Sequence, residues 1–314
     1  MVKRVMPAID GAIKPASGLT REGQPLSYNR AAVPELRPWI SRLYATVVKA
    51  PDDYQLSCGL LNDTAFMRIQ LQGEWHAQTA HGPLTHSRAA LFFGPQSHRM
   101  PVSVTGSFIS IGVSLRPGAC HAFKGPSIPD HLDAIVTTDA IGHSSEALLP
   151  RFAPDADPED WLQELEAIVR CMVERHGGVE PDPITTRFET VCFADPTLSI
   201  RDIAGECGVE LRKLERTIRR DFGMPPKQVL RRARALDMAS QLRGVADQEE
   251  ADELALRYYD QSHQIREFIE LFGMSPSQFV AKPQPLMTLA LESRQARRLE
   301  SLERISPGGQ RPWQ

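Results

Sequence analysis

Residues Ser199–Pro226 and Ala251–Phe279 repeat one pattern, and this repeat strongly restricts how that part of the chain can fold. Each copy contains a short apolar segment, a turn, a second segment with a polar face, and a Gly-Met-x-Pro motif near its end. Two helices joined by so short a turn pack directly on each other as a helix-turn-helix unit. The repeat therefore predicts an all-α region that holds two such units.

The first copy carries the local signals of a helix start, a turn and a second helix. Ser199 and Asp202 fit a capping box, in which the serine hydroxyl accepts a hydrogen bond from a backbone N–H group of the first helical turn. Gly208 supplies the positive φ that ends the first helix. Helical spacing then predicts a buried face made of Ile200, Ile203, Ala204 and Cys207 in the first helix and of Leu211, Leu214, Ile218 and Phe222 in the second.

The opposite face of the second helix is predicted to be exposed and mostly basic. It carries Arg212, Lys213, Glu215, Arg216, Arg219 and Arg220. A charged face of this kind often belongs to a helix that is simply solvated. Here the capped neighbour, the turn glycine and the one-sided clustering of the arginines favour a helix that lies in the major groove of duplex DNA.

These segments resemble the DNA-binding domain of the AraC/XylS-type transcriptional regulators, which has two helix-turn-helix units joined by one long helix. The resemblance covers about residues 184–283. Its most specific part lies in the second unit, in the segments Tyr258–His263, Arg266–Phe268 and Phe272–Phe279.

The resemblance implies which side chains contact DNA. Arg212, Glu215 and Arg216 would face base edges in the first unit, and Gln261, His263 and Arg266 would do so in the second. The chemistry is suitable, because arginine can bond guanine through two hydrogen bonds, glutamine can bond adenine, and glutamate can accept from cytosine.

The second unit departs from the family pattern in two places. Arg257 stands where the family usually has glycine, and Ile269-Glu270 stands where basic residues are common. Residues 196–244 hold 11 Lys/Arg against 6 Asp/Glu, a net charge of +5, whereas residues 245–283 hold 3 against 8, a net charge of −5. Because phosphate neutralisation supplies most of the non-specific affinity for DNA, we expect the first unit to anchor the protein and the second to discriminate between sequences.

Residues 55–116 are predicted to be β structure. Apolar and small or polar residues alternate over residues 109–115 and again over residues 67–72, with the period of a half-buried strand. Turn-forming residues divide these runs, which predicts a small antiparallel barrel or sandwich. The segments Phe93–Gln96 and Gly112–Ala119 resemble the cupin-like sensor domain found ahead of some of these DNA-binding domains. That resemblance implies a site for a small effector or a dimer contact.

A helix is predicted from Asp157, which can cap it, and Pro158, which suits its first position. One face of this helix carries Trp161, Leu165, Ile168 and Met172. This apolar face fits either packing on its own domain or a contact in a dimer.

The sequence thus predicts an α+β multidomain chain. We expect a disordered leader (1–25), a cupin-like antiparallel β-barrel with C-terminal helices for sensing or dimerisation (26–180), an all-α double helix-turn-helix domain (181–283) and a C-terminal extension (284–314). Glycines 177–178 and the prolines at 181 and 183 mark the main boundary. Residues 289–302 predict a helix in the extension, and we expect its Arg294, Arg297, Arg298 and Arg304 to be solvated rather than bound to phosphate.

Composition excludes several classes of protein. No apolar run approaches the roughly 20 residues that span a bilayer. The five cysteines are scattered, which is typical of reduced thiols in the cytoplasm. His76, His81 and His86 recur at a five-residue spacing, which places successive side chains on opposite strand faces and does not favour a metal site. No sequence motif of a catalytic or cofactor site is present, so we expect neither enzyme activity nor a cofactor.

The leading interpretation is a cytoplasmic, sequence-specific transcriptional regulator, more often an activator than a repressor in this family. Its partners would be double-stranded DNA and RNA polymerase, and the interpretation leaves room for a small-molecule effector and a homodimer. One alternative is a cupin-type metal enzyme fused to a DNA-binding module. Another is a protein-interaction factor whose second unit no longer reads DNA.

Overall fold

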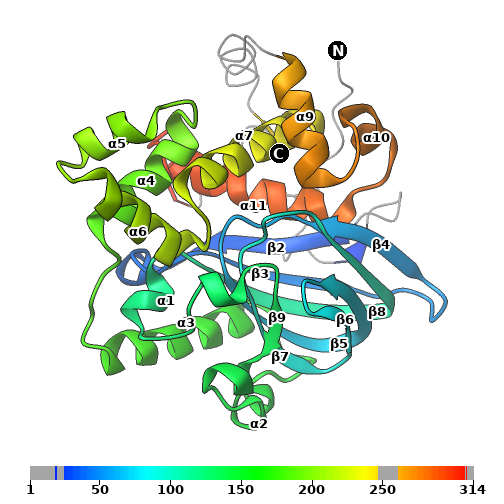
Figure 1. Cartoon of the computed structure of the whole chain (residues 1–314). Helices are drawn as coiled ribbons and strands as arrows, with labels where there is room; N and C mark the ends of the chain where they lie inside the picture. The colour runs from blue at the N-terminus through cyan, green and yellow to red at the C-terminus, as the bar shows by residue number, and fades with distance from the viewer. Residues whose placement is uncertain (1–17, 20–24, 247–260, 308, 310–314) are drawn as a thin grey trace.

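One antiparallel sheet and two sets of helices make up the fold (Figure 1). The computed structural model describes residues 18–19, 25–246, 261–307 and 309. The strands are β1 (Gly18–Leu19), β2 (Pro25–Ala31), β3 (Ile40–Val48), β4 (Gln55–Leu60), β5 (Phe66–Thr79), β6 (Gly82–His86), β7 (Ala89–Phe93), β8 (Met100–Leu115) and β9 (Ile135–Thr137). Apart from β1 and Pro25, the predicted leader lies outside the described residues.

The long strand β8 organises the sheet. It pairs with β5 along most of its length, with β3 through Phe108–Leu115 and with β4 through residues 100–105. The described strands follow the order β1-β2-β3-β8-β5-β7-β9, with β4 added on β8 and β6 on β5. The predicted antiparallel domain is confirmed, and its described strands form an open order with two ends. Strands β2 and β3 precede the region in which the sequence predicted β structure.

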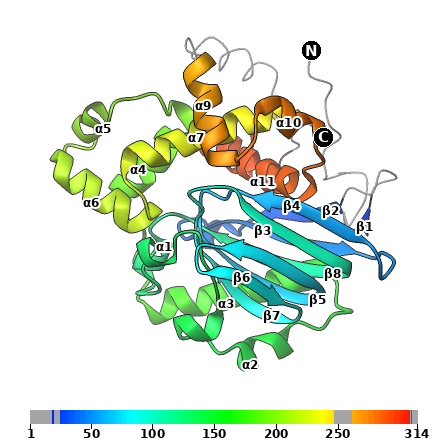
Figure 2. The same ribbon diagram turned by 45° about the vertical axis from the view of Figure 1, so that its right-hand side comes forward.

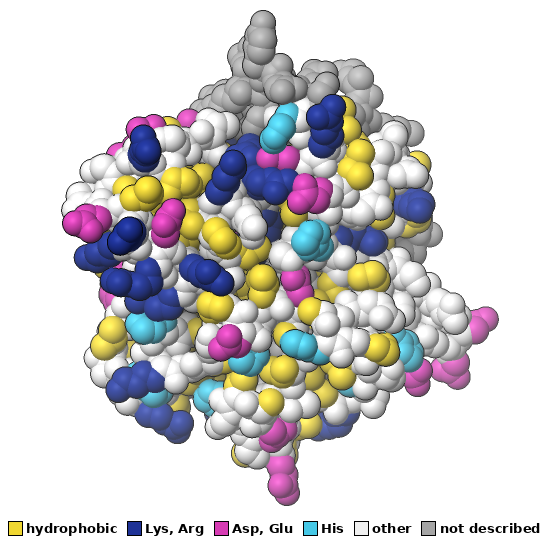
Figure 3. Space-filling view, in the orientation of Figure 1, with side chains coloured by type: hydrophobic (Ala, Val, Ile, Leu, Met, Phe, Trp, Pro, Cys, Tyr) yellow, Lys and Arg dark blue, Asp and Glu magenta, His cyan; other side chains and the backbone are white. Residues whose placement is uncertain are grey.

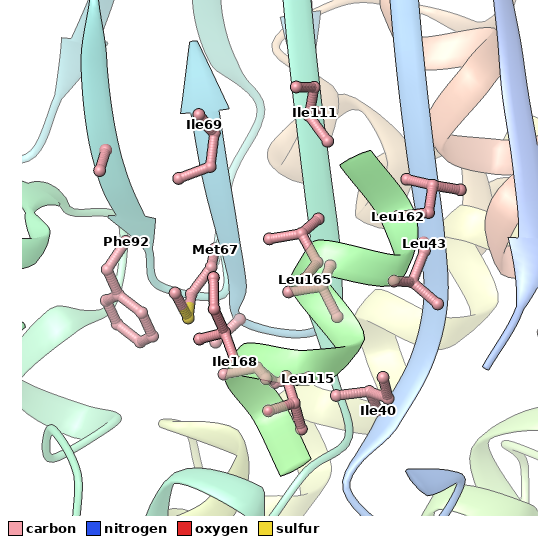
Figure 4. Close-up of a cluster of buried hydrophobic side chains, with 14 of the residues drawn as sticks. Ile40, Leu43, Met67, Ile69, Phe92, Ile111, Leu115, Leu162, Leu165 and Ile168 are labelled. Carbon is pink, nitrogen blue, oxygen red and sulfur yellow. The ribbon is translucent and has the colours of Figure 1, made fainter. Parts of the chain in front are cut away.

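One face of the sheet packs against helix α3 (Pro158–Arg175), as Figure 4 shows. Asp157 caps this helix as predicted, because its carboxylate accepts a hydrogen bond from Glu159 N at 2.9 Å. Trp161, Leu165 and Ile168 lie in one core with apolar residues of β3, β5, β7 and β8. The apolar face of α3 therefore packs on its own domain, as the first of the two predicted alternatives stated.

The other face of the sheet is polar, yet it is covered by helix α11 (Pro285–Ser301) (Figures 1 and 2). Its buried polar residues include Thr46, Gln70 and Ser110. The prediction of a solvated helix in the extension is wrong. Arg294, Arg297 and Arg298 are buried, because carboxylates of other elements bind them: Asp237 lies 2.6 Å from Arg294 Nη1, and Asp63 lies 2.6 Å from Arg297 Nη2. Arg304, beyond the end of α11, is exposed.

In the part of the predicted all-α region that the structure describes, the α-helices are α4 (Pro183–Ala194), α5 (Ile200–Glu206), α6 (Leu211–Phe222), α7 (Pro226–Leu242), α9 (Gln261–Phe272) and α10 (Pro276–Ala281). Short helices α1 (Ala119–Ala122) and α2 (Ser145–Leu148) follow the large strands. Among the described residues, 3-10 turns span Pro34–Leu36, Pro129–His131, Thr138–Ile141 and Leu149–Arg151. None of the described helices is long and apolar enough to cross a membrane.

Two apolar clusters hold these helices in place. The first unit has its own core, which joins Phe188, Ile203, Leu214 and Val229. The second unit packs through stacked Phe268 and Phe272 into a cluster that continues through α7 and α11 to strands β4, β5 and β8. The second unit and the sheet therefore share a core, although they lie far apart in the sequence.

Candidate nucleic-acid interface

Helices α5 and α6 form the first predicted helix-turn-helix unit. Ser199 Oγ accepts a hydrogen bond from Asp202 N at 3.1 Å, which is the serine half of the predicted capping box. Gly208 has a φ of +62°, so it turns the chain as predicted. A second positive φ, +80° at Gly223, ends α6. Ser199 therefore marks where α5 begins, Gly208 turns the chain between α5 and α6, and Gly223 marks where α6 ends.

The residues predicted to be buried in α5 and α6 are buried or partly buried, except for the first residue of α6. Leu214, Ile218 and Phe222 are buried, and so are Ile203 and Ala204 of α5. Ile200 and Cys207 pack partly buried against the same core. Leu211 is 36% exposed, so the prediction that it is buried is wrong. Leu211 is the first residue of α6, and the buried residues of this helix begin one turn later, at Leu214.

The outer face of α6 carries five charged side chains without a protein partner. Arg212, Lys213, Glu215, Arg216 and Arg219 are all exposed. None of them forms an ion pair or a hydrogen bond through its side chain with any residue that the structure describes. In the space-filling view, Lys and Arg side chains gather over α6 (Figure 3). This face is therefore free to bind a charged partner.

Arg220 differs from these five residues. Its side chain is 34% exposed, and its Nε donates to Asp221 Oδ1 at 2.6 Å, while Asp182 Oδ2 lies 3.8 Å from Nη2. The hydrogen bond with Asp221 raises the pKa of Arg220 above its usual value. Arg220 thus contributes positive charge at the end of α6 but is held in place by two carboxylates.

The arginines of α7 have structural partners instead. Arg232 is buried and donates to the backbone carbonyl of Gln96 at 2.7 Å and to that of Asp63 at 2.9 Å. Burial lowers the pKa of Arg232 to about 10. Arg231 and Arg234 bind carboxylates of α9. A basic run in the sequence thus divides into a free set on α6 and a bonded set on α7.

Helix α9 carries the predicted contacts of the second unit. His263 and Arg266 are exposed, and His263 Nδ1 lies 3.5 Å from Glu267 Oε1. Gln261 begins α9, but its side chain lies outside the described part of the chain, as do Arg257 and residues 258–260. The same helix exposes two apolar side chains, Ile265 at 40% and Ile269 at 43%.

The acidic residues of α9 are partly neutralised by arginines of α7, the long helix between the two units. Glu267 is 4% exposed and lies 2.8 Å from Arg234 Nη2 and 3.1 Å from Arg231 Nε. Glu270 Oε2 lies 2.5 Å from Arg231 Nη2, and this hydrogen bond lowers the pKa of Glu270. The net charge of −5 counted from the sequence therefore overstates the negative charge that the second unit presents to a partner.

The N-terminal domain also contributes to this region, which the sequence did not predict. A hollow of about 600 Å³ lies between Arg216, Arg219 and Arg220 on α6 and the segment 121–129. That segment carries His121 and Lys124, both exposed. No local signal in the sequence could place them beside α6, because the docking of the two domains brings them there.

The histidines considered as metal ligands lie on three different elements. His76 is on β5, where its ring nitrogens lie 2.9 Å from Thr85 Oγ1 and 3.0 Å from Glu74 Oε1. His81 lies in the turn that follows β5, and His86 ends β6. Within the described ranges, no group of three or more His, Cys, Asp or Glu side chains is placed to hold a metal ion.

Comparisons with known proteins give matches in sequence and in structure. A family model described as a helix-turn-helix domain matches residues 196–282. No curated protein matches the chain. An apo form of ToxT from Vibrio cholerae is similar in structure with a TM-score of 0.43 at 9% identity, over 76% of this chain and 97% of that one. Unsaturated fatty acid-bound wild-type ToxT from Vibrio cholerae gives 0.42 at 12%, over 76% and 94%. The AraC-like transcriptional activator CuxR gives 0.27 at 12%, over 73% and 90%.

The sequence match spans α5, α6, α7, α9 and α10. Residues 196–282 therefore form a helix-turn-helix domain of the AraC type, the DNA-binding domain of a class of transcriptional regulators.

Proposed function

We propose that the chain is a sequence-specific transcriptional regulator that reads two successive major-groove segments, with α6 in the first. The observation that carries this proposal is the outer face of α6, where four cations and one carboxylate are exposed and have no side-chain partner among the residues that the structure describes. An exposed basic helix oriented by a capped neighbour fits the width and the hydrogen-bonding pattern of the major groove.

The side chains on α6 would divide between bases and phosphates. Arg212, Glu215 and Arg216 lie in its first half and would contact base edges. Lys213, Arg219 and Arg220 would contact phosphates, with Arg220 already oriented by Asp221. In the second unit, Gln261, His263 and Arg266 would contact bases.

The first unit would anchor the protein, and the second would discriminate between sequences. The free cations on α6 support the first half of this division. On α9, Arg266 is the exposed cation, while Glu267 and Glu270 bind arginines of α7. Because phosphate contacts supply non-specific affinity and base contacts supply specificity, α9 would add selectivity more than affinity.

The rest of the proposal concerns regulation. The sheet domain would act as a sensor for a small effector and could also hold a homodimer together. RNA polymerase would be the protein partner at the promoter, with activation as the outcome. The chain would act in the cytoplasm through binding rather than through catalysis.

Footprinting of the full-length protein on genomic fragments tests the proposal. We expect specific protection over about two helical turns, roughly 20 base pairs. Protection of no sequence, even at low ionic strength, would contradict it and would favour a factor that acts through protein partners. A tightly bound metal in the purified protein, together with turnover of a substrate, would favour the fused enzyme instead.

A further inference from the structure

A cavity of about 90 Å³ lies between α11 and the face of the sheet that this helix covers. The strands contribute Tyr44 and Thr46 of β3, Arg68 of β5 and Ser110 of β8. Helix α11 contributes residues at helical spacing, namely Leu286, Leu289, Ala290 and Ser293, so one face of that helix forms a wall. The wall therefore comes from the C-terminal extension, which lies beyond the matched domain.

Arg68 is the central charged group of this cavity. Its side chain is only 9% exposed, and its Nε donates to the hydroxyl of Tyr44 at 2.9 Å. Its guanidinium carbon lies 4.5 Å from the ring centre of Phe93 and 5.0 Å from that of Phe66, with Trp75 at 5.6 Å. Within the described chain, no carboxylate pairs with Arg68.

The positive charge of Arg68 is buried, and no carboxylate among the described residues balances it. The faces of aromatic rings attract a cation, but they offset only part of the cost of removing it from water. An anion that entered the cavity would supply the missing counter-charge.

Two further polar groups that line the cavity have no partner among the described residues, namely the hydroxyl of Ser110 and the indole Nε1 of Trp75. Both amide atoms of Gln70, which does not line the cavity but lies next to Ser110, are also without a partner there. Gln70 and Ser110 are direct neighbours across β5 and β8, so their side chains share a face of the sheet. Buried polar groups in native proteins are nearly always hydrogen-bonded, which indicates that a ligand or ordered water completes this site.

We propose that this cavity binds a small organic carboxylate, with the carboxylate on Arg68 and the apolar body against α11. The charged lining is Arg68, Arg294 and Arg297 against Asp63, and Asp63 already accepts from both arginines of α11. Because one water needs roughly 10–15 Å³ of such space, the cavity holds a molecule of about six to nine non-hydrogen atoms. Phe66, Phe108 and Leu286 would contact its apolar part.

The position of the cavity links the ligand to the DNA-binding domain. Helix α11 packs on α7, and Arg294 Nη1 donates to Asp237 of α7 at 2.6 Å. A carboxylate that fills the space under α11 would stabilise this arrangement relative to any other. The regulatory meaning of the site rests on the proposed function, whereas binding itself can be measured without DNA.

Calorimetric titration of the full-length protein with benzoate and hexanoate tests the proposal, with benzamide and hexanamide as neutral controls of the same shape. We expect saturable binding of at least one carboxylate and binding of its amide at least tenfold weaker. Arg68→Met should weaken carboxylate binding by about 10- to 100-fold, because a charge-assisted hydrogen bond is lost. Arg175→Met, which alters an exposed arginine at the end of α3, should leave it unchanged.

A second variant separates loss of the site from loss of the fold. Ala290→Leu fills the cavity from α11 without changing a charge, and we expect it to abolish carboxylate binding while the protein still folds. The proposal is overturned if neither carboxylate binds, if the amides bind as well as the acids, or if Arg68→Met binds like the unaltered protein. A protein that binds DNA but no carboxylate refutes only the cavity assignment, and one that binds a carboxylate but no DNA refutes only the proposed function.

Discussion

Asp63, which lies between β4 and β5, accepts a hydrogen bond at 2.6 Å from Arg297, three turns along α11. The same carboxylate oxygen accepts from Arg294 at 3.2 Å, and the backbone carbonyl of Asp63 accepts from Arg232 of α7 at 2.9 Å. One residue of the sheet domain therefore binds arginines of both the DNA-binding domain and the extension.

Asp63→Asn should destabilise the protein, because it leaves Arg294 and Arg297 buried without their counter-charge. We expect the free energy of unfolding to fall by about 3 kcal/mol, as for a broken buried ion pair. Urea unfolding followed by circular dichroism measures the change. Glu35→Gln, which removes an exposed ion pair with Arg170, should leave the transition unchanged. Equal behaviour of the two variants would contradict the structural role of Asp63.

The stabilisation that Asp63 provides by binding Arg294 and Arg297 should depend on pH in a defined direction. Burial alone would raise the pKa of Asp63, but the charges of Arg297, Arg294 and Arg232 outweigh it and hold the pKa at about 2. An unfolded aspartate has a pKa of about 3.9. The stabilisation is therefore fully present above pH ~4 and is lost as the pH falls from about 4 to about 2. The stability difference between the unaltered protein and Asp63→Asn should shrink over this interval and stay constant above it.

Glu267→Gln should loosen the contact between α9 of the second unit and α7. Glu267 is buried on α9 and receives hydrogen bonds from Arg234 at 2.8 and 3.0 Å. The substitution leaves two arginines of α7 without their shared carboxylate, at a cost of about 3 kcal/mol. Amide hydrogen exchange should then speed up in residues 267–272 more than in α5 and α6. Glu270→Gln, at an exposed position, is the matched control and should change exchange little.

Gly112→Ala should disturb the floor of the cavity. A Cβ atom at this position would lie 2.4 Å from two carbons of the Tyr44 ring, so the ring that holds Arg68 must move. We expect a loss of about 1–3 kcal/mol, as for an overpacked core. Gly205→Ala is the control with the opposite sign, because nothing lies within 4 Å of its added methyl group and alanine favours the helix. Thermal unfolding distinguishes the two, and a neutral Gly112→Ala would contradict this packing.

Arg219→Ala should change how DNA binding depends on salt. Arg219 is exposed near the end of α6, where we assign it to a phosphate. Loss of Arg219 should reduce the magnitude of the negative slope of log affinity against log salt concentration by about 1. The reduction should be the same on specific and on non-specific duplexes. A titration from low to moderate salt measures the slope. An effect confined to one DNA sequence would assign Arg219 to a base instead.

The local signals in the sequence were sufficient for the first unit. Ser199, Gly208 and the spacing of Leu214 and Ile218 act within one or two helical turns, so the sequence around them specifies α5 and α6. Asp157 specifies the start of α3 in the same way. Alternation of apolar and polar residues is also a local pattern, because residues two places apart in a strand lie on the same face of the sheet. It therefore predicted the antiparallel strands.

What the sequence could not show depends on contacts between distant segments. Alternation marked Gln70 and Ser110 as the polar side of half-buried strands, but it cannot distinguish a face in water from one covered by α11. The arginines of α11 looked solvated because Asp63 and Asp237, which neutralise them, lie far away in the sequence. Charge counting also failed to show that Arg231 binds the acidic residues of α9.

If the exposed face of α6 lies in a DNA groove, Arg216 is one of the side chains that bind the DNA. Gel-shift titration of the full-length protein on its footprinted site can measure this, with Arg216→Ala compared with Arg266→Ala and with Arg175→Ala as control. We expect Arg216→Ala to weaken binding by about 10- to 100-fold, Arg266→Ala to weaken it less, and Arg175→Ala to have no effect. Unchanged affinity of Arg216→Ala would contradict the placement of α6 in the groove, and equal losses at Arg216 and Arg266 would contradict the division between anchoring and discriminating units.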